Sequence, residues 1–351
     1  MPTLKNLLQA FRRFVIRLLI KPLLRWQPLE ATAPGYTIVV ACHWRFPEMF
    51  EASLLFLAKQ DLRDFHSLIC AIDAPKSVSL ELATQQIQAK FPTLRITFLF
   101  QTRIQSLVLR RINWGWVDCW LSYCKGLAQV STRYVMLHDM DAMLLDPGFI
   151  RQRYECITSK QLDFLGVRWY TYNGLEESDR LLYVVEMMLD VQWLRRHFAP
   201  IDLFNKLYYI GKRRLDLDTL IYPQIQSTAK MEMPIGVDQW VHPSQVISQF
   251  TYLVARPGYI PPVANNLFFI PYFMHLAGYP TAMREQSEHL ARAVDGSTVV
   301  FFGHVMNMKN MTREHFAWIK KQVEQVEISF AGRVRDDVSS YLTAISDKIA
   351  A

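Results

Sequence analysis

The sequence predicts an α/β fold with a mainly parallel sheet flanked by helices. Apolar, β-branched runs alternate with amphipathic segments over residues 36–150, which is the pattern of repeated strand–helix units. Hydrophobic residues make up 51% and charged residues 20% of the 351 residues, so the chain can form a substantial core and is not intrinsically disordered. This length suits one large domain with appendages or two modest domains.

The predicted strands and helices follow one another in a regular order. Strands are expected over residues 36–41, 65–73 and 94–100, with a fourth inside 133–149, and helices over 51–61, 79–90 and 116–130. Right-handed crossovers join consecutive parallel strands. Ligands of such sheets bind beyond the carboxyl ends of the strands, where we expect His43, Asp73, Asp139 and Asp141 to converge.

Residues 1–29 are predicted to form a basic amphipathic helix. Residues 1–26 contain six Lys or Arg residues and no acidic residue, and their apolar residues recur at helical spacing. Pro22 should end or kink the helix near Ile20. No apolar run reaches the roughly 20 residues that span a bilayer, and arginines interrupt any signal-peptide core. The helix would either lie on an anionic membrane surface or pack on the protein's own body with a solvated basic face.

The net charge of +7 belongs almost entirely to this first segment. The other 325 residues hold 33 basic and 32 acidic side chains, so nucleic acid is not an expected partner. The five cysteines include no CxxC pair and fit neither a disulfide framework nor a zinc site, which favours a reducing compartment. We therefore expect a cytoplasmic protein that is peripheral on the inner face of the membrane.

Four sequence segments carry a recognisable pattern. In chain order they read IVVACHWRFPEMF from the first strand into its loop, ICAIDAPKS at the second strand, SYCKGLAQV before the acidic strand, and YVMLHDMDAMLLDPGF with an Asp-x-Asp signature. Together they resemble the GT-A fold glycosyltransferases, most closely the inverting glycosyltransferase family 2. The resemblance covers residues 36–150 and departs from the family pattern at Cys42, Trp44 and Cys124. It implies the following division: a nucleotide-sugar-binding half over 30–150, an acceptor-binding and catalytic half over 151–310, and C-terminal helices over 311–351.

The resemblance implies that Asp139 and Asp141 bind Mn²⁺ or Mg²⁺, with Asp141 as a direct ligand and Asp139 also contacting the donor. Residues two apart in an extended chain point to one side, so both carboxylates can reach one ion. Such a hard cation binds diphosphate oxygens and would neutralise a departing diphosphate. The alternative is an ordinary acidic turn. Further donor-binding residues are implied at Ala41, His43, Arg45 and Asp73, where Asp73 would bind the nucleotide base or merely cap a helix.

An inverting transfer needs a carboxylate that takes the proton from the acceptor hydroxyl. The resemblance implies Asp238 for this catalytic role, in the segment MPIGVDQWVHPSQVISQF, where a helix N-terminal acid is the alternative. Trp240 is a candidate for stacking on an acceptor sugar, or a core aromatic residue. His304, in the strand-like run STVVFFGHVMN, is the candidate third metal ligand, with His275 as its rival; either is otherwise a structural histidine.

These inferences predict a metal-dependent enzyme that moves a sugar from a nucleotide-sugar, a UDP-sugar being favoured, to a glycan or lipid-linked acceptor, with inversion. One alternative keeps the fold but changes the reaction, to a retaining GT-A glycosyltransferase or a nucleotidyltransferase. The absence of glycine from the CHWRFPEMF loop disfavours nucleotidyl transfer, which usually uses a glycine-rich phosphate loop. The other alternative is a non-catalytic GT-A-like peripheral membrane protein.

Overall fold

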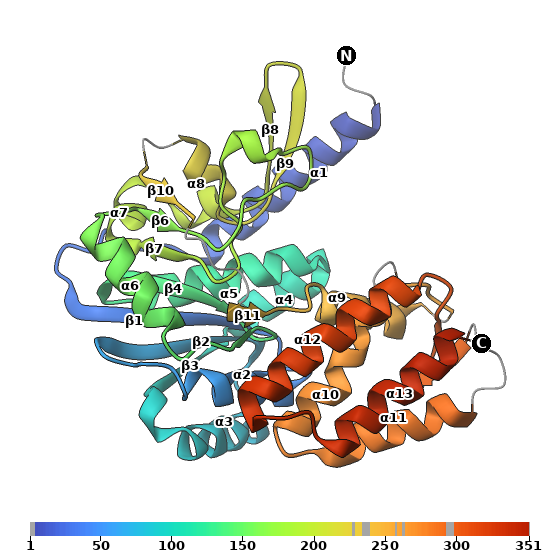
Figure 1. Ribbon diagram of the computed structural model, residues 1–351. Helices are drawn as coiled ribbons and strands as arrows, with labels where there is room; N and C mark the ends of the chain where they lie inside the picture. Colours follow the sequence, from blue (N-terminus) through green and yellow to red (C-terminus); the bar gives the residue numbers. More distant parts are fainter. Residues whose placement is uncertain are drawn as a thin grey trace. The chain divides into compact units, whose positions relative to one another are not determined.

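The computed structural model describes residues 4–226, 229–233, 239–256, 258–261, 264–292 and 298–350 (Figure 1). The chain forms two compact units, and each unit is assembled from stretches that are separate in sequence. The first unit comprises Met1–Trp44, Asp61–Met140 and Ile150–Val237, and the second comprises Arg45–Gln60, Asp141–Phe149 and Asp238–Ala351. The unit boundaries therefore interleave, whereas the sequence suggested consecutive segments.

A seven-stranded sheet forms the centre of the first unit, in the order β10-β6-β7-β4-β1-β2-β3. Its strands are β1 (Ala33–Cys42), β2 (Phe65–Pro75), β3 (Ile96–Gln101), β4 (Thr132–Asp139), β6 (Phe164–Leu165), β7 (Met188–Asp190) and β10 (Met231–Glu232). The pairs β4-β1, β1-β2, β2-β3 and β10-β6 are parallel, and only β7 runs antiparallel to its neighbours. The predicted mainly parallel sheet is confirmed.

Helices and a hairpin complete the first unit. They are α1 (Leu4–Ile20), α3 (Val78–Lys90), α4 (Arg103–Ile112), α5 (Gly115–Gln129), α6 (Phe149–Ser159, whose first residue belongs to the second unit), α7 (Val191–His197), α8 (Ile221–Gln226), and the strands β8 (Lys206–Ile210) and β9 (Arg213–Leu217). The predicted helices over 79–90 and 116–130 are present within one or two residues. Helix α4 was not predicted from the sequence.

The core of the sheet explains why β1 is so apolar. Ile38, Val39 and Val40 are fully buried, as expected for a central strand covered on both faces. Helix α5 approaches this strand closely at Gly126, where a Cβ atom would lie 2.3 Å from a methyl group of Val39. The glycine of the SYCKGLAQV segment is thus required for helix–sheet packing, since any larger side chain would push α5 away from β1.

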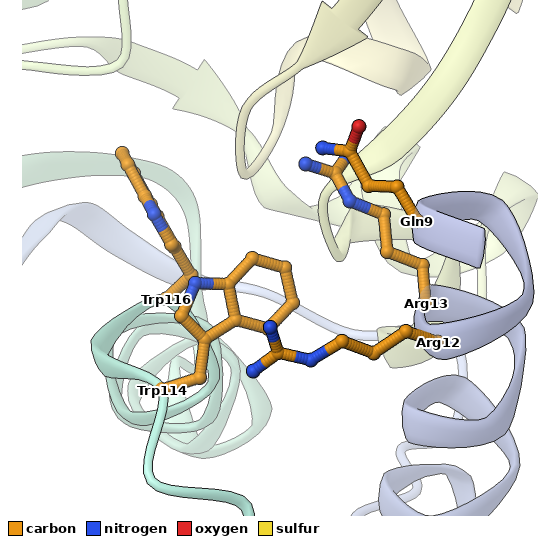
Figure 2. Close-up of a pocket in the computed structure, with 5 residues that line it drawn as sticks. All are labelled: Gln9, Arg12, Arg13, Trp114 and Trp116. Atoms are coloured by element: carbon orange, nitrogen blue, oxygen red, sulfur yellow. The ribbon is translucent and has the colours of Figure 1, made fainter. Parts of the chain in front are cut away.

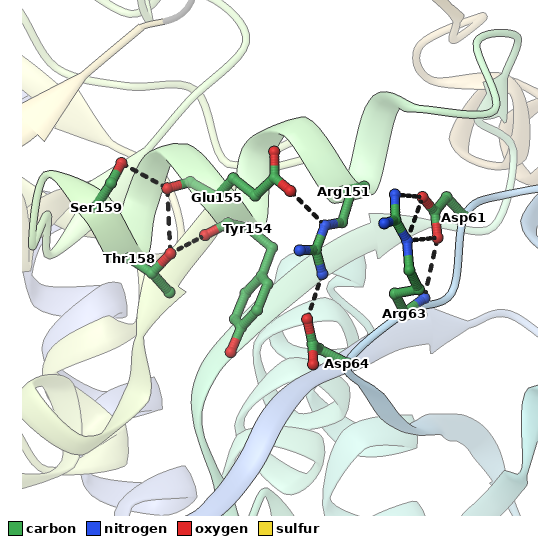
Figure 3. A network of polar contacts seen from close by, with 8 residues as sticks. All are labelled: Asp61, Arg63, Asp64, Arg151, Tyr154, Glu155, Thr158 and Ser159. Atoms are coloured by element: carbon green, nitrogen blue, oxygen red, sulfur yellow. Dashed lines mark hydrogen bonds and ion pairs between the residues drawn. The ribbon is translucent and has the colours of Figure 1, made fainter.

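A surface network of ion pairs joins α6 to the loop before β2 (Figure 3). The Arg151 guanidinium donates to Asp64 and, at 2.6 Å, to Glu155 one helical turn away. Arg63 pairs with Asp61 in the same loop. Each of these pairs has at least one partner that is more than half exposed, so the network contributes little to stability. The network orients the loop before β2. In this loop the Asp64 carbonyl accepts a hydrogen bond from the amide of Tyr36, at 3.0 Å. Tyr36 is also the residue at which β1 begins to pair with β2.

Helix α1 ends at Ile20, immediately before Pro22, as predicted. One side of the helix is held against the first unit. Ile16 and Ile20 are buried, and the Arg13 guanidinium forms a bidentate pair with Asp216 of β9, with the second bond at 2.7 Å. Arg17 donates to the carbonyl of Phe204 at 3.1 Å. Figure 1 shows α1 running beside the β8–β9 hairpin.

The opposite side of α1 carries an exposed apolar strip, defined as Leu7, Leu8, Phe11, Phe14, Val15, Leu18 and Leu19. Phe11 is 66% exposed and Leu8 is 61% exposed, although both are large apolar side chains. One side of α1 thus packs on the protein's own body, whereas the apolar strip does not. Binding of the strip to a membrane stays a prediction. No helix in the described ranges is long and apolar enough to cross a membrane.

The second unit is mainly helical. It contains α2 (Pro47–Leu57), β5 (Met143–Leu144), β11 (Trp240–Val241), α9 (Val246–Ala255), α10 (Phe269–Leu276), α11 (Pro280–Arg292), β12 (Thr298–Phe301), β13 (His304–Asn307), α12 (Arg313–Ala331) and α13 (Asp336–Ala350). The run STVVFFGHVMN is a hairpin rather than one strand. Phe302 and Gly303 both have positive φ, 45° and 76°, as a two-residue type I′ turn requires.

Candidate active site

The carboxyl edge of the sheet brings several predicted residues together within the first unit. Asp139 is the last residue of β4, and in the parallel register its neighbour on β1 is Ala41. Ala41 in turn pairs with Ala71 of β2, two residues before Asp73. This register brings Asp73 and Asp139, two of the residues predicted to converge, to one edge of the sheet, with Ala41 between their strands.

The side chain and backbone of Asp139 are both held by buried groups. The phenol of Tyr123, from α5, donates a hydrogen bond to Oδ1 of Asp139. Burial, reinforced by the Asp139 charge, raises the pKa of Tyr123 well above its usual value, so the phenol stays neutral and remains a donor. The amide N–H of Asp139 donates to Oε1 of Glu186 at 3.2 Å. Asp139 therefore has a fixed orientation.

A buried network of three ionisable side chains adjoins the backbone of Asp139: His138, Glu186 and Arg153. The Glu186 carboxylate lies 2.8 and 2.9 Å from Nδ1 of His138, and both side chains are fully buried. The Arg153 guanidinium donates to the carbonyls of Leu165, at 2.6 Å, and Glu186, at 3.0 Å. Burial lowers the pKa of Arg153 to about 10, with the nearby Glu186 charge opposing the shift. The Arg153 guanidinium therefore remains charged at neutral pH.

The loop after β1 folds onto Asp73. The amide of Trp44 donates to Oδ1 of Asp73 at 2.9 Å, and Nδ1 of His43 lies 3.5 Å from Oδ2. The His43 amide donates to the sulfur of Met140 at 3.1 Å. Trp44 packs edge-on against Phe98 of β3, with ring centroids 6.4 Å apart. His43 and Asp73 are therefore neighbours, as the sequence predicted, and Trp44 orients the Asp73 carboxylate.

Two residues of α5 complete the surroundings of this edge. The Lys125 ammonium donates to the carbonyl of Phe100 at the end of β3, and lies 3.3 Å from Oε1 of Gln105. Burial lowers the pKa of Lys125 to about 8. Burial raises the pKa of Asp118 to about 6, and the charge of Asp73 adds to the shift. The negative charge of Asp73 therefore disfavours ionisation of Asp118.

The raised pKa of Asp118 predicts a pH-dependent stability difference. Because the folded state keeps this proton to higher pH than the unfolded chain, the contribution of protonated Asp118 is complete below about pH 4. It is lost as the pH rises through about 6. We therefore expect Asp118→Asn to be more stable than the wild type at pH 7–8, with the difference shrinking towards zero at pH 4. Urea unfolding of both proteins between pH 4 and pH 8 measures this difference in the free energy of unfolding, with Glu177→Gln, at an exposed position, as control. A difference that is the same at all pH values would contradict the prediction.

In the second unit, Asp141 is paired with a histidine that the sequence did not single out. Nε2 of His242 lies 3.2 Å from Oδ1 of Asp141, and the two side chains are 4% and 11% exposed. His242 directly follows β11, which pairs antiparallel with β5 so that Trp240 lies opposite Leu144. The Trp240 indole stacks on the His242 ring, with centroids 5.9 Å apart and planes at 26°. Trp240 therefore orients His242.

Arg45 and His304 lie on a common aromatic residue in the second unit. The Arg45 guanidinium lies 4.9 Å from the ring centroid of Phe250, and the His304 ring meets the same ring edge-on at 6.1 Å. Among the described residues, the histidine beside Asp141 is His242 rather than His304. The role of His304 as a metal ligand stays a prediction.

His275 lies in the interior of the second unit, whereas Asp238 is not among the described residues. His275 is a buried residue of α10 whose Nε2 lies 3.2 Å from Asp337 of α13, and burial lowers its pKa. Its burial and its contact with Asp337 fit the role of a structural histidine, which the sequence also allowed. Asp238, the predicted catalytic base, lies outside the described residues. Among the residues described after it, Trp240 is in strand β11, and the next α-helix, α9, starts at Val246.

His242 and Glu186 are the site residues that the sequence did not predict. His242 lies 101 positions after Asp141 and forms no spaced ligand motif with another histidine. The usable signal was its place four residues after Asp238, in the segment already assigned to catalysis. Glu186 carried no signal, because its contact with His138 depends on the antiparallel placement of β7 beside β4.

Comparisons with known proteins give similar solved structures at low identity. The chain is similar to a mannosyltransferase from Pyrobaculum calidifontis in complex with GDP-mannose and Mn²⁺, at 14% identity over 98% of this chain and 94% of the other, with a TM-score of 0.41. It is similar to residues 1–349 of S. aureus TarS, at 10% identity over 89% and 90% of the two chains, with a TM-score of 0.33. A third similar structure is core-mannan synthase A from Aspergillus fumigatus in its Mn/GDP form, at 9% identity over 49% and 66%, with a TM-score of 0.30. No protein-family model and no curated protein sequence matches this chain.

Proposed function

We propose that this protein is a divalent-metal-dependent glycosyltransferase that uses a nucleotide-sugar donor. The observation that carries the proposal is the buried Asp141–His242 pair, two residues after Asp139 at the carboxyl end of β4. A carboxylate oxygen and an imidazole nitrogen 3.2 Å apart are donor atoms of the kind that bind one divalent transition-metal ion. The proposal also rests on the resemblance of residues 36–150 to GT-A enzymes.

The donor atoms fit a divalent transition metal such as Mn²⁺ better than Mg²⁺. Asp141 and His242 of the second unit supply a carboxylate oxygen and an imidazole nitrogen. Mg²⁺ favours oxygen ligands and retains its waters, whereas imidazole suits transition metals. When bound, the cation would hold the donor's diphosphate and neutralise the charge of the leaving group. We propose Asp141 and His242 as its protein ligands, together with Asp139, which the Asp-x-Asp signature implies.

The chain's own residues would orient the donor and acceptor. Tyr123 and Glu186 hold Asp139 in one position, and Trp240 does the same for His242. Asp73, oriented by Trp44, would accept a hydrogen bond from the nucleotide base, with a UDP-sugar favoured. Asp238 remains our proposal for the base that removes the acceptor proton, which would give inversion. The acceptor proposed is a glycan or a lipid-linked sugar.

The proposed chemistry is tested by incubating the protein with UDP-, GDP- and TDP-sugars and Mn²⁺, and identifying the products. We expect slow release of the nucleoside diphosphate from one donor, and loss of this release when EDTA removes the metal. Release of pyrophosphate would identify a nucleotidyltransferase instead. Absence of any product, with membrane extracts supplied as acceptor, would leave only the non-catalytic alternative.

We further propose that the exposed apolar strip of α1 binds the cytoplasmic face of an anionic membrane. Seven large apolar side chains face away from the first unit. The cations of residues 1–26 other than Arg13 and Arg17, which contact the first unit, would complement an anionic surface. Each Lys or Arg near such a surface contributes about 1 kcal/mol. This placement would bring the enzyme to lipid-linked acceptors.

The double substitution Phe11→Ser/Phe14→Ser tests this attachment. Both rings are exposed, so we expect unchanged stability but vesicle binding about a hundredfold weaker, at about 1.5 kcal/mol for each apolar side chain removed from the membrane. Co-sedimentation with anionic vesicles measures the effect. Val78→Ser/Leu82→Ser, which removes two exposed apolar residues of α3, is the matched control and should bind normally. Equal binding by both variants would refute attachment through α1.

A further inference from the structure

A hollow of about 280 Å³ lies between α1 and the start of α5, within the first unit (Figure 2). It is lined by Gln9, Arg12, Arg13, Trp114 and Trp116. Trp114 lies against both arginines, with guanidinium carbons 5.8 Å and 5.5 Å from its ring centroid. Figure 2 shows the side chains of α1 on one side and the two indoles on the other.

The polar groups lining this hollow are donors. Guanidinium and indole groups have no hydrogen-bond acceptor. The one acceptor oxygen, Oε1 of Gln9, already receives a hydrogen bond from Arg214 of β9, which leaves the amide N–H groups of Gln9 available to a ligand. A site of donors alone suits a ligand that is rich in acceptors and negatively charged.

The hollow also has an excess of positive charge. The Arg13 charge is balanced by Asp216, but none of the ion pairs among the described residues involves Arg12. Stacking on an indole holds the Arg12 guanidinium flat without neutralising it. Arg12 thus supplies a planar fork of donors of the kind that matches phosphate oxygens.

Arg12 also connects the hollow with the exposed apolar strip. Leu8 and Val15 lie four residues before and three residues after Arg12, which makes them its neighbours on the helix surface. Trp116, at the other side of the hollow, is 42% exposed, and tryptophan is favoured at the boundary between membrane and water. An anion bound by Arg12 would therefore lie at headgroup depth when the strip is in the acyl boundary.

We propose that this hollow binds the phosphate of a membrane lipid, with preference for a terminal phosphomonoester. The inference rests on the proposed membrane attachment through α1. A terminal phosphate presents three oxygens free of a headgroup alcohol, which suits several donors in a small space. The bound lipid would fix the rotation of α1 on the membrane and hence the direction in which the first unit faces.

The test compares co-sedimentation of the full-length protein with two sets of phosphatidylcholine vesicles, one containing phosphatidic acid and one phosphatidylglycerol, adjusted to equal surface charge. We expect the wild type to bind the phosphatidic acid vesicles at least tenfold more tightly. Arg12→Gln should abolish this preference. Lys21→Gln removes one charge from the same segment outside the hollow, so it should weaken binding to both vesicles by about fivefold and keep the preference.

Three outcomes would overturn part of the inference, and they are distinguishable. A wild type that binds neither vesicle would refute the membrane attachment itself. Equal binding to both vesicles, or equal effects of Arg12→Gln and Lys21→Gln, would refute the phosphate site alone. Glycerol 3-phosphate binding in solution as tightly as vesicles, and lost in Arg12→Gln, would assign the hollow to a soluble phosphate ester instead. Circular dichroism of both variants verifies that they are folded.

Discussion

Asp141→Asn is expected to weaken Mn²⁺-dependent binding of the donor nucleotide on the order of a thousandfold. Asparagine keeps the size of the side chain but removes the charge that would bind the cation, and metal stabilisation of a diphosphate amounts to several kcal/mol. Isothermal titration with the nucleoside diphosphate, with and without Mn²⁺, measures the loss.

Asp146→Asn is the matched control for this variant. Asp146 lies in the same short stretch of the second unit, and its carboxylate accepts from the amide of Gly148 at 2.8 Å. We expect Asp146→Asn to retain metal-dependent nucleotide binding within a few-fold of the wild type. Equal losses in the two variants would show that Asp141 acts through the loop's structure. Wild-type affinity in Asp141→Asn would remove it from the metal site.

Glu186→Ala is expected to lower the free energy of unfolding by about 3–5 kcal/mol, the usual cost of removing one partner of a buried ion pair. The substitution removes the buried carboxylate that pairs with Nδ1 of His138 and whose negative charge acts on the buried Arg153 guanidinium. It also removes the acceptor for the Asp139 amide. Urea unfolding measures the loss, and nucleotide binding should weaken in the same variant because Asp139 is no longer held.

Glu155→Ala provides the comparison for Glu186→Ala. Glu155 also pairs with an arginine, Arg151, but its side chain is 56% exposed. Exposed pairs contribute about 0–1 kcal/mol, so the Glu155→Ala variant should unfold close to the wild type. A loss below 1 kcal/mol in Glu186→Ala would mean that the buried network does not stabilise the sheet.

The strands and helices around β1 could be predicted because burial on both faces leaves a strong sequence pattern. The runs YTIVVA and FHSLICAID lie within β1 and β2, each of which has a neighbouring strand on both sides. β6, β7 and β10 contain only two or three residues each. Strands this short have no measurable period, and their positions depend on tertiary pairing.

The site was predictable where its residues follow strands, and not where it depends on long-range packing. Asp73 and Asp139 come at or near the ends of β2 and β4, so parallel pairing alone brings them to one edge. His242 reaches Asp141 through the pairing of β11 with β5, two-residue strands about a hundred positions apart. The outward orientation of the apolar strip on α1 depends on the Arg13–Asp216 pair, which no helical periodicity reveals.

Pulsed electron paramagnetic resonance of the protein with one equivalent of Mn²⁺ tests the proposed metal site most directly. A coordinated imidazole couples its ¹⁴N nucleus to the Mn²⁺ spin. We predict such a coupling in the wild type, its retention in His304→Ala and His275→Ala, and its loss in His242→Ala. A wild-type spectrum without nitrogen coupling, or a coupling that persists in His242→Ala, would contradict a cation bound by Asp141 and His242.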